Sequence, residues 1–469
     1  MWGMRPRELS ALTQEGMTLG SFSTRRVGQF VLAGVFVFAV FHGGLWLVLS
    51  DFTDVPGVPD SLRYEEIARN LIAGRGYTLS RGEGYAPTLW REPGYPAFLA
   101  VVYRIAGDDR VTVKLIQILL FGMISLLAYV LASGLFASRR AALAVGALTA
   151  GSVSLASYST LLLSENLITL VLLTALITAS RALRGNGLGF YLITGGLLGF
   201  AGLIKAVLLP VVFFLVLIVF LNRGRTKSTC LAVGVLILSF SLVVGLWSWR
   251  NYRQFGTLAV AGRGGEALYL SALKLDDSMA DHLRRTIFDL SQELGRKWYP
   301  GQEDPTRTDT ERVLVRLRAL FGTGMNEWEV DSVLRKEAVA RVVERPVKYA
   351  LVAGVGVLTL AAFGDVPVMV APALQANFPG GNGGIVVAKL LFRLAGYVIF
   401  FMALLGLLAI PGRNGPWAFA AAVVGYTLVA YALVFTDRRY VVPLVPTLNL
   451  LAVLCWLRRP AKILPLGDE

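Results

Sequence analysis

The sequence predicts an all-α membrane protein that crosses the bilayer many times. Hydrophobic residues make up 55% of its 469 residues, the mean hydropathy is +0.61, and only 16% of the residues are charged. Soluble domains carry about 25% charged residues. Apolar runs of about 20 residues, the length that spans a bilayer, recur along the chain. Much of the net charge of +14 lies in short clusters between these runs, which is typical of membrane topology and not of nucleic-acid binding.

The apolar runs predict about 10–12 transmembrane helices. The clear runs lie at about 27–49, 111–136, 141–163, from Glu165 to a basic cluster at 181–187, 188–204, 206–222, 229–249, 385–411, 416–435 and 440–457. A further apolar block, 346–375, contains proline, glycine and aspartate, which suits a re-entrant segment covered by protein or water. This block crosses the membrane either twice or not at all if both chain termini lie in the cytoplasm.

The basic residues predict the topology. The N-terminal "STRR" precedes a run that is too long for a typical signal sequence and lacks a small-residue cleavage site, so we expect a retained first span with a cytoplasmic N-terminus. Two large polar regions then fall on the outer face. They divide the chain into an N-terminal membrane module (1–249) whose first outer loop (51–110) is expected to be catalytic, an outer cap (250–345) and a C-terminal membrane module (346–469).

The first outer loop begins with an amphipathic helix in "VPDSLRYEEIARNLIAGRGY" (58–77), which Gly74 and Gly76 end. Its spacing places Glu65 on the polar face of this helix, away from the apolar face. Asp60 at its start is either an N-cap or an acid displayed for chemistry. Further along, "WREPGYP" (90–96) places a charged pair in a frame of aromatic residues and prolines. Such a pair either anchors the loop at the membrane interface or supplies a phosphate clamp, because a guanidinium donates hydrogen bonds in pairs.

Charged residues also lie at the ends of spans. Glu165, in "LLLSENLITL", is either a functional acid or a first-turn acid favoured by the helix dipole. Lys205, in "AGLIKAVLLP", either snorkels to lipid headgroups or binds an anion. Arg250 and Arg439 lie at predicted outer span ends, where the positive-inside rule disfavours them. Bases and acids on one face predict a site where a carboxylate acts as base while a phosphate leaves.

Several motifs occur in order along the chain: "DSLRY" and "GRGY" in the first loop, "WREPGYP", "SE" (164–165), "GLIK" (202–205), "WSWRNYRQFG" (247–256) and "RYVVPLVP" (439–446). Together they resemble the GT-C superfamily of polytopic glycosyltransferases over roughly residues 27–458. The nearest branch is similar to the bacterial relatives of dolichyl-phosphate-mannose protein mannosyltransferases and of lipid A aminoarabinose transferases. The chain departs from the usual pattern at Ser61, Glu92 and Leu246, where a second acid, a lysine and a proline are frequent.

The resemblance implies an inverting transfer of a sugar from a polyprenyl-phosphate donor to an acceptor hydroxyl. It implies that Asp60 orients or deprotonates the acceptor, and Glu165 matches an acid common at this span junction. The implied phosphate-binding residues are Arg91, Lys205, Arg250 and Arg439, and the implied substrate contacts are Tyr64, Trp90, Glu92 and Tyr440.

The expected partners are the lipid-linked donor, a protein, lipid or glycan acceptor, and membrane lipids, but not nucleic acid. The expected location is the plasma (inner) membrane, with the site on its periplasmic or extracytoplasmic face. No cofactor and no dedicated metal site are expected, because the histidines and cysteines are few and scattered. A divalent cation shared between a carboxylate and a substrate phosphate is still compatible with the sequence.

Two other functions stay open at this point. A transporter or flippase for a lipid-linked anion would often show repeated or broken spans, and the sequence shows no internal repeat. A non-catalytic scaffold of the cell envelope would not need Asp60 and Glu165 on the same face.

Overall fold

The computed structural model describes residues 29–50, 59–81, 84–185, 187–290, 292–362, 381–410 and 415–457. Nearly all of these residues belong to helices or their connections, apart from one antiparallel hairpin, β1 (Thr78–Arg81) with β2 (Gly84–Pro87). The predicted all-α class is therefore confirmed, and the hairpin is a small addition that the sequence analysis missed.

Eight helices among the described residues are long and apolar enough to cross a membrane. They are Gln29–Leu49, α4 (Arg110–Leu135), α7 (Glu165–Leu183), η1 with α9 (Ala206–Arg223), α10 (Lys227–Phe255), Val386–Leu408 within α18 (Gly381–Leu408), α19 (Gly415–Val434), and η4 with α20 (Arg438–Leu457). Shorter apolar helices are α3 (Gly94–Ala106), α8 (Leu188–Ile204) and α16 (Pro346–Ala361). The chain is a multi-pass membrane protein, as predicted.

The predicted span at 141–163 is not a single helix. It divides into α5 (Arg139–Ala150) and α6 (Val153–Tyr158), followed by turns and bends up to 164. The Ser152 hydroxyl caps α6 by accepting a hydrogen bond from the Leu155 N–H at 3.4 Å. Serine and threonine hydroxyls compete for backbone hydrogen bonds, which explains why this apolar run is interrupted. The question whether 346–375 crosses the membrane involves residues 363–380, which lie outside the described residues.

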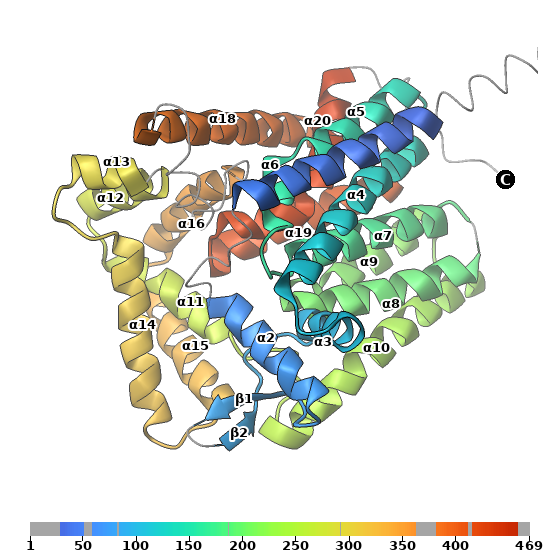
Figure 1. The fold of residues 1–469 in the computed structure, drawn as a ribbon. Helices are drawn as coiled ribbons and strands as arrows, with labels where there is room; N and C mark the ends of the chain where they lie inside the picture. The colour runs from blue at the N-terminus through green and yellow to red at the C-terminus, as the bar shows by residue number, and fades with distance from the viewer. Residues whose placement is uncertain are drawn as a thin grey trace, which may run out of the picture.

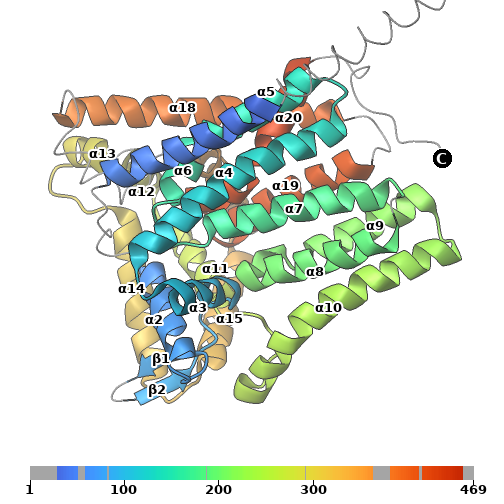
Figure 2. The ribbon, with the colours of Figure 1, turned by 45° about the vertical axis from the view of Figure 1, so that its right-hand side comes forward.

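The long helices lie side by side and bury a continuous apolar core (Figures 1 and 2). Within it, α8 packs against both α7 and α10. Gly195 and Gly199 line the α8–α10 contact, and a β-carbon built at Gly195 would lie only 2.2 Å from the Leu236 carbonyl oxygen. Small residues spaced by four allow two helix backbones to approach closely in a membrane.

We expect Gly195→Ala to destabilise the bundle by about 1–3 kcal/mol, because the added methyl group overpacks the α8–α10 contact. Gly196→Ala is the matched control, since a β-carbon there meets nothing within 4 Å. Alanine is the better helix former, so this control should be neutral or stabilising. Thermal unfolding of both variants in detergent measures the difference, and equal midpoints would contradict this packing.

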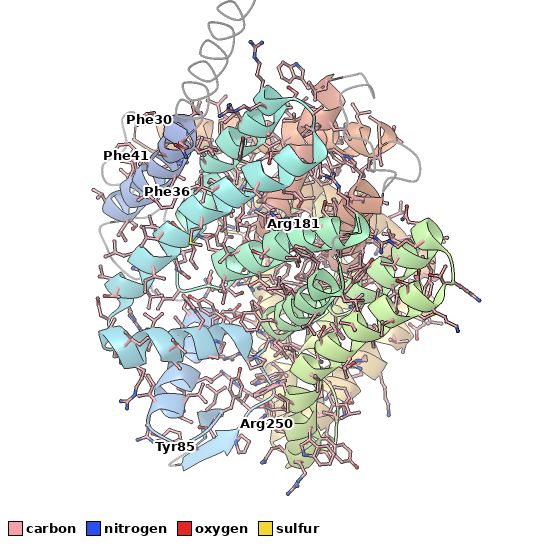
Figure 3. The ribbon with its side chains drawn as sticks, turned by 90° about the vertical axis from the view of Figure 1, so that its right-hand side faces the viewer. Phe30, Phe36, Phe41, Tyr85, Arg181 and Arg250 are labelled. Atoms are coloured by element: carbon pink, nitrogen blue, oxygen red, sulfur yellow. The ribbon has the colours of Figure 1, made fainter. Side chains whose placement is uncertain are left out.

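The first helix lies at the periphery of the bundle. Figure 3 shows Phe30 and Phe41 on this helix, and their side chains are 75% and 67% exposed. Exposed aromatic side chains on an apolar helix are suited to lipid contact, because burial of apolar surface in the bilayer replaces burial in protein. This observation agrees with a membrane-spanning first helix.

The two large polar regions cover one end of the bundle, here called the cap end (Figure 2). The first contributes α2 (Pro59–Ile72), the hairpin and α3, and the second contributes α11 (Gly264–Leu273), η2 (Lys274–Asp276), α12 (Met279–Leu290), α13 (Gln292–Trp298), α14 (Pro305–Phe321) and α15 (Glu327–Glu344). The Glu327 carboxylate accepts hydrogen bonds from the Thr88 hydroxyl at 3.1 Å and from the Leu89 N–H, which joins the two regions. The domain boundaries at 249 and 345 stay a prediction.

The predicted amphipathic helix in the first loop is α2, and one residue of its polar face was misplaced. Glu65 is only 1% exposed. Its carboxylate accepts hydrogen bonds from Arg110 Nε at 2.6 Å and from the Tyr103 hydroxyl at 3.0 Å. Because these partners come from α4 and α3, the acid holds α2 against the bundle instead of facing water.

Candidate active site

Asp60 lies in the first turn of α2, at the cap end, and its side chain is almost buried. Both carboxylate oxygens contact arginines from distant parts of the chain. Oδ1 pairs with Arg91, which precedes α3, and Oδ2 lies 2.8 Å from Arg439 Nη2 in η4. Oδ1 also lies 3.7 Å from Arg263 Nη1, at the start of α11. Asp60 is therefore the common partner of three arginines, and not only a residue at the start of a helix.

The electrostatic environment keeps Asp60 ionised. Burial acts to raise the pKa of its carboxyl, but the charges of Arg439, Arg91 and Arg263 outweigh burial and hold the pKa far below its usual range. A carboxylate with such a low pKa is a weak proton acceptor at neutral pH. In this arrangement Asp60 is a counterion of the arginines, and a role as base would require the loss of arginine partners.

The segment that carries Arg91 is fixed on both sides. The Tyr77 hydroxyl donates to the backbone oxygens of Arg91 at 3.0 Å and of Glu92 at 3.1 Å. The Glu92 carboxylate accepts a hydrogen bond from the Ala206 N–H at 3.3 Å. Arg91 also lies over the ring of Tyr64, 5.6 Å from its centroid. These contacts connect the first loop to the turn between α8 and α9, next to Lys205.

Glu165 and Lys205 form a second, deeper pair. Lys205 Nζ lies 3.3 Å from Glu165 Oε1, and the two side chains are 12% and 1% exposed. The other carboxylate oxygen of Glu165 is buried and has no hydrogen-bond partner within the described structure. A buried acceptor without a partner is costly, so this oxygen is free to accept a hydrogen bond from a hydroxyl of a bound molecule.

Aromatic rings connect the two clusters. Lys205 Nζ lies 5.3 Å from the centroid of the Tyr440 ring, and the Arg439 guanidinium carbon lies 5.0 Å from the same centroid. Tyr440 stacks on Tyr431, with ring centroids 4.3 Å apart. Cations over aromatic faces are stabilised by the ring quadrupole. Tyr440 therefore lies between the Asp60 cluster and the Glu165–Lys205 pair.

Arg250 has a different environment from the other predicted phosphate ligands. Its Nη1 donates to the Thr88 carbonyl at 2.9 Å and its Nη2 to the Tyr77 carbonyl at 3.0 Å. Figure 3 shows Arg250 near the end of α10 and Tyr85 on the hairpin, at the same end of the molecule. These donors are engaged by backbone, so the geometry favours a role for Arg250 in holding the first loop onto α10.

Arg263 is a member of the site that the sequence analysis missed. Besides Asp60, it binds Glu266 bidentately, with two nitrogen–oxygen distances of 2.8 Å. Burial acts to lower the pKa of Arg263, but Glu266 and Asp60 raise it above its ordinary value. In the sequence, an arginine and a glutamate three residues apart are typical of an ordinary surface pair on a helix, so no signal marked Arg263 as functional.

The structure thus brings the predicted residues together in one continuous region at the cap end. The residues joined by direct contacts there are Asp60, Tyr64, Arg91, Glu92, Glu165, Lys205, Arg439 and Tyr440. Trp90 borders this region, because Arg263 lies over its ring at 5.9 Å. Among the described residues, no group of three histidine, cysteine, aspartate or glutamate side chains is placed to hold a metal ion.

Comparison with sequence families gives a match over part of the chain. Residues 90–249 match the family described as dolichyl-phosphate-mannose-protein mannosyltransferase. This segment includes Arg91, Glu165 and Lys205. No curated protein sequence matches the chain significantly.

Solved structures give a match over most of the chain. The archaeal oligosaccharyltransferase AglB from Archaeoglobus fulgidus, in complex with an inhibitory peptide and a dolichol-phosphate, superposes with a TM-score of 0.51 at 14% identity, over 91% of this chain and 50% of that chain. ArnT from Cupriavidus metallidurans, bound to undecaprenyl phosphate, gives a TM-score of 0.37 at 16% identity, over 90% of this chain and 78% of that chain. The chain spans about half the length of the AglB chain that it matches.

The similarity to AglB shows the fold, and the family match covers the segment that carries much of the candidate site. The resemblance predicted from the ordered motifs is thereby confirmed: the chain has the fold of the GT-C superfamily of polytopic membrane glycosyltransferases.

Proposed function

We propose that this protein transfers a sugar from a polyprenyl-phosphate donor to an acceptor hydroxyl, with inversion at the anomeric carbon. The observation that carries the proposal is the convergence of Arg91, Arg263 and Arg439 on the single carboxylate of Asp60. Arg91 is buried and the other two arginines are partly buried. Such a group binds a phosphate readily, because guanidinium donors match phosphate oxygens. The matched family and the dolichol-phosphate bound in the AglB complex support a lipid phosphate as the donor.

Donor binding and the basicity of Asp60 are coupled in this proposal. The donor phosphate takes up arginine donors that otherwise pair with Asp60, and the pKa of Asp60 rises because those positive charges are shared. Asp60 then accepts the proton of the acceptor hydroxyl. The acceptor oxygen bonds to the anomeric carbon while the bond from that carbon to the phosphate oxygen breaks, and polyprenyl phosphate leaves with its negative charge held by the arginines.

Glu165 is proposed to hold the sugar. Lys205 is proposed to contact the phosphate that links the sugar to the polyprenyl chain. The partnerless oxygen of Glu165 suits a sugar hydroxyl, and Lys205 lies between Glu165 and the ring of Tyr440. Tyr440 lies next to Arg439 in the chain, so a sugar held there is adjacent to a phosphate held by the arginines. Tyr64, Trp90 and Glu92 are proposed to shape the surrounding walls.

A double substitution separates the structural role of this pair from its role in transfer. Lys205→Met alone leaves Glu165 as an uncompensated buried charge, which is expected to cost about 3–5 kcal/mol of stability. Adding Glu165→Gln removes the charge and should restore most of the thermal stability. We expect this stable double variant to transfer sugar at least about tenfold more slowly than the native protein, a loss of about 1.4 kcal/mol in transition-state stabilisation. A stable double variant with native transfer would assign the pair to structure alone.

An apolar cavity of about 780 Å³ is proposed to hold part of the polyprenyl chain. It lies between α5, α6, α18 and α20, and Val445, which lines it, directly follows the η4 segment of Arg439. Ala395 lines the cavity from α18, whereas the exposed Leu394 beside it does not.

We expect Ala395→Trp to raise the KM for a long-chain donor by about tenfold while leaving a short-chain donor nearly unaffected. Burial of each methylene group of the polyprenyl chain contributes about 0.8 kcal/mol to binding, so loss of contact with two methylenes is enough for this effect. Leu394→Trp adds a tryptophan on the neighbouring surface and serves as the control. Equal effects on both donors would place the polyprenyl chain elsewhere.

The proposed location is the plasma membrane, with the cap end on its outer face. The arginine and lysine clusters at 138–140, 181–187 and 222–227 support this orientation, because the positive-inside rule favours their placement in the cytoplasm. Labelling of single cysteines at the cap end by an impermeant reagent on intact cells tests it, and labelling only after lysis would reverse the orientation.

Membranes that hold the protein, a radiolabelled polyprenyl-phosphate sugar and an extract of potential acceptors test the reaction itself. We expect label in an acceptor together with an equal amount of free polyprenyl phosphate, and neither product from matched membranes without the protein. Movement of intact donor across the bilayer without release of polyprenyl phosphate would favour a flippase. If neither sugar transfer nor movement of the donor is observed, a scaffold role is the remaining candidate.

A further inference from the structure

A polar cavity of about 550 Å³ lies beside the Asp60 cluster and is here called the cap cavity. Its lining includes Arg63 and Glu66 of α2, Trp90 of the first loop, and Phe321, Met325 and Glu327 around the connection between α14 and α15. Both polar regions of the cap end therefore contribute to its walls.

The cap cavity and the Asp60 cluster share a border. Arg63 follows Asp60 by three residues on α2, so the two side chains lie on the same side of the helix. Trp90 precedes Arg91, the direct partner of Asp60. Arg263 contacts both regions, with its guanidinium carbon 5.9 Å from the Trp90 ring centroid and its Nη1 3.7 Å from Asp60 Oδ1. A molecule in the cap cavity is therefore adjacent to the proposed base.

Among the described polar side chains that line the cap cavity, Arg63 is available to bind an anion. The Glu66 carboxylate accepts the Ser80 N–H at 2.5 Å, and the Glu327 carboxylate accepts the Thr88 hydroxyl and the Leu89 N–H. Arg63 is partly buried, and within the described part of the chain no carboxylate lies within ion-pair distance of it. Burial and the repulsion of Arg91 and Arg263 lower the pKa of Arg63, and they outweigh the attraction of Glu266 and Asp60. An anion beside Arg63 would relieve both effects.

We infer that the cap cavity binds the acceptor, and that the acceptor carries an anionic group, a phosphate or a carboxylate, close to the hydroxyl that receives the sugar. In this assignment Arg63 binds the anionic group. Trp90 and Phe321, which pack edge to face with centroids 5.8 Å apart, provide an apolar wall for the rest of the acceptor. The inference rests on the proposed function, because an acceptor site has meaning only for a transferase.

The test compares Arg63→Gln with Arg104→Gln, which removes an exposed arginine of α3 that lines neither cavity. Both full-length variants are assayed with a radiolabelled polyprenyl-phosphate sugar and an acceptor extract, and slow hydrolysis of the donor by water is measured without the extract. For Arg63→Gln we expect transfer at limiting extract to fall at least about tenfold, the loss of one charge-assisted hydrogen bond. The donor KM and donor hydrolysis should stay within about twofold, and Arg104→Gln should resemble the native protein.

The labelled product identifies the anion. After exhaustive digestion, we expect the smallest labelled fragment from the native reaction to migrate as an anion at neutral pH. Loss of that charge with phosphatase would identify a phosphate, and resistance would identify a carboxylate. A neutral or cationic fragment would overturn the inference, as would native acceptor transfer by Arg63→Gln.

A raised donor KM in Arg63→Gln would also overturn the inference, because it would assign Arg63 to the donor phosphate. Failure of the proposed function gives a different result, because the native protein itself would then neither transfer sugar from the donor nor hydrolyse the donor.

Discussion

Asp60→Asn is expected to lower the rate of sugar transfer by about 10²–10⁴-fold, the range that a positioned general base contributes. The amide keeps the size of the side chain but does not accept the proton of the acceptor hydroxyl. The rate is measured as label transferred from a polyprenyl-phosphate sugar at saturating donor. The Asp60 side chain lies among Arg91, Arg263 and Arg439, so the variant also loses the countercharge of three arginines.

A stability control separates these two effects of Asp60→Asn. Thermal unfolding in detergent reports the cost of the uncompensated arginines, which is largest when no anion is bound, and polyprenyl phosphate should restore stability by binding them. Asp108→Asn removes an exposed acid of the same loop that pairs with Arg69 at 2.7 Å. Transfer by this control should stay within about twofold of the native rate, because exposed ion pairs contribute little. A folded Asp60→Asn protein with a native rate would eliminate Asp60 as the base.

Arg439→Gln is expected to lower kcat/KM for the donor by about 100-fold, or about 2.7 kcal/mol. Arg439 Nη2 lies 2.8 Å from Asp60 Oδ2, and the guanidinium also lies over the Tyr440 ring, so it borders both proposed subsites. Its loss removes a cation that is proposed to stabilise the leaving phosphate. Initial rates over a range of donor concentrations measure the effect.

The neighbouring arginine provides the matched control for Arg439→Gln. Arg438 Nη1 donates to the backbone oxygen of Asp289 at 2.9 Å, which connects η4 to the cap. Arg438→Gln therefore loses an arginine from the same segment without removing a partner of Asp60. We expect its donor kcat/KM to stay within about threefold of native. Equal losses in both variants would mean that the segment, and not the Arg439 charge, supports transfer.

The sequence predicted most of the spans because a membrane helix needs a long apolar run, and composition alone reveals such runs. It missed the interruption between α5 and α6, because the hydroxyl groups that satisfy the backbone there add little polarity to the run. It missed the hairpin as well, since each strand has only four residues. Glu65 was placed on the wrong face of α2, because its partners Arg110 and Tyr103 come from other helices.

The candidate site was predicted where an unusual charge stood beside an apolar run. Glu165 and Lys205 stood out for this reason, and the structure pairs them. Arg263 and Arg63 did not stand out, because each lies in a polar segment where an arginine is ordinary. Their proposed roles depend on which helices contact one another at the cap end, and residue spacing along the chain does not reveal these tertiary contacts. The same limit applies to Arg250, whose donors are used by the backbone of the first loop.

The central claim is that Asp60 and the donor phosphate compete for the same arginines, and the affinity of the Asp60→Asn variant for polyprenyl phosphate tests it most directly. Binding of fluorescent polyprenyl phosphate to native and variant proteins in the same detergent gives the two Kd values. The claim predicts that the variant binds about tenfold more tightly, a gain of about 1.4 kcal/mol, although it has lost transfer. Unchanged or weaker binding by a folded variant would show that the arginines around Asp60 do not hold the donor phosphate, and would contradict the claim.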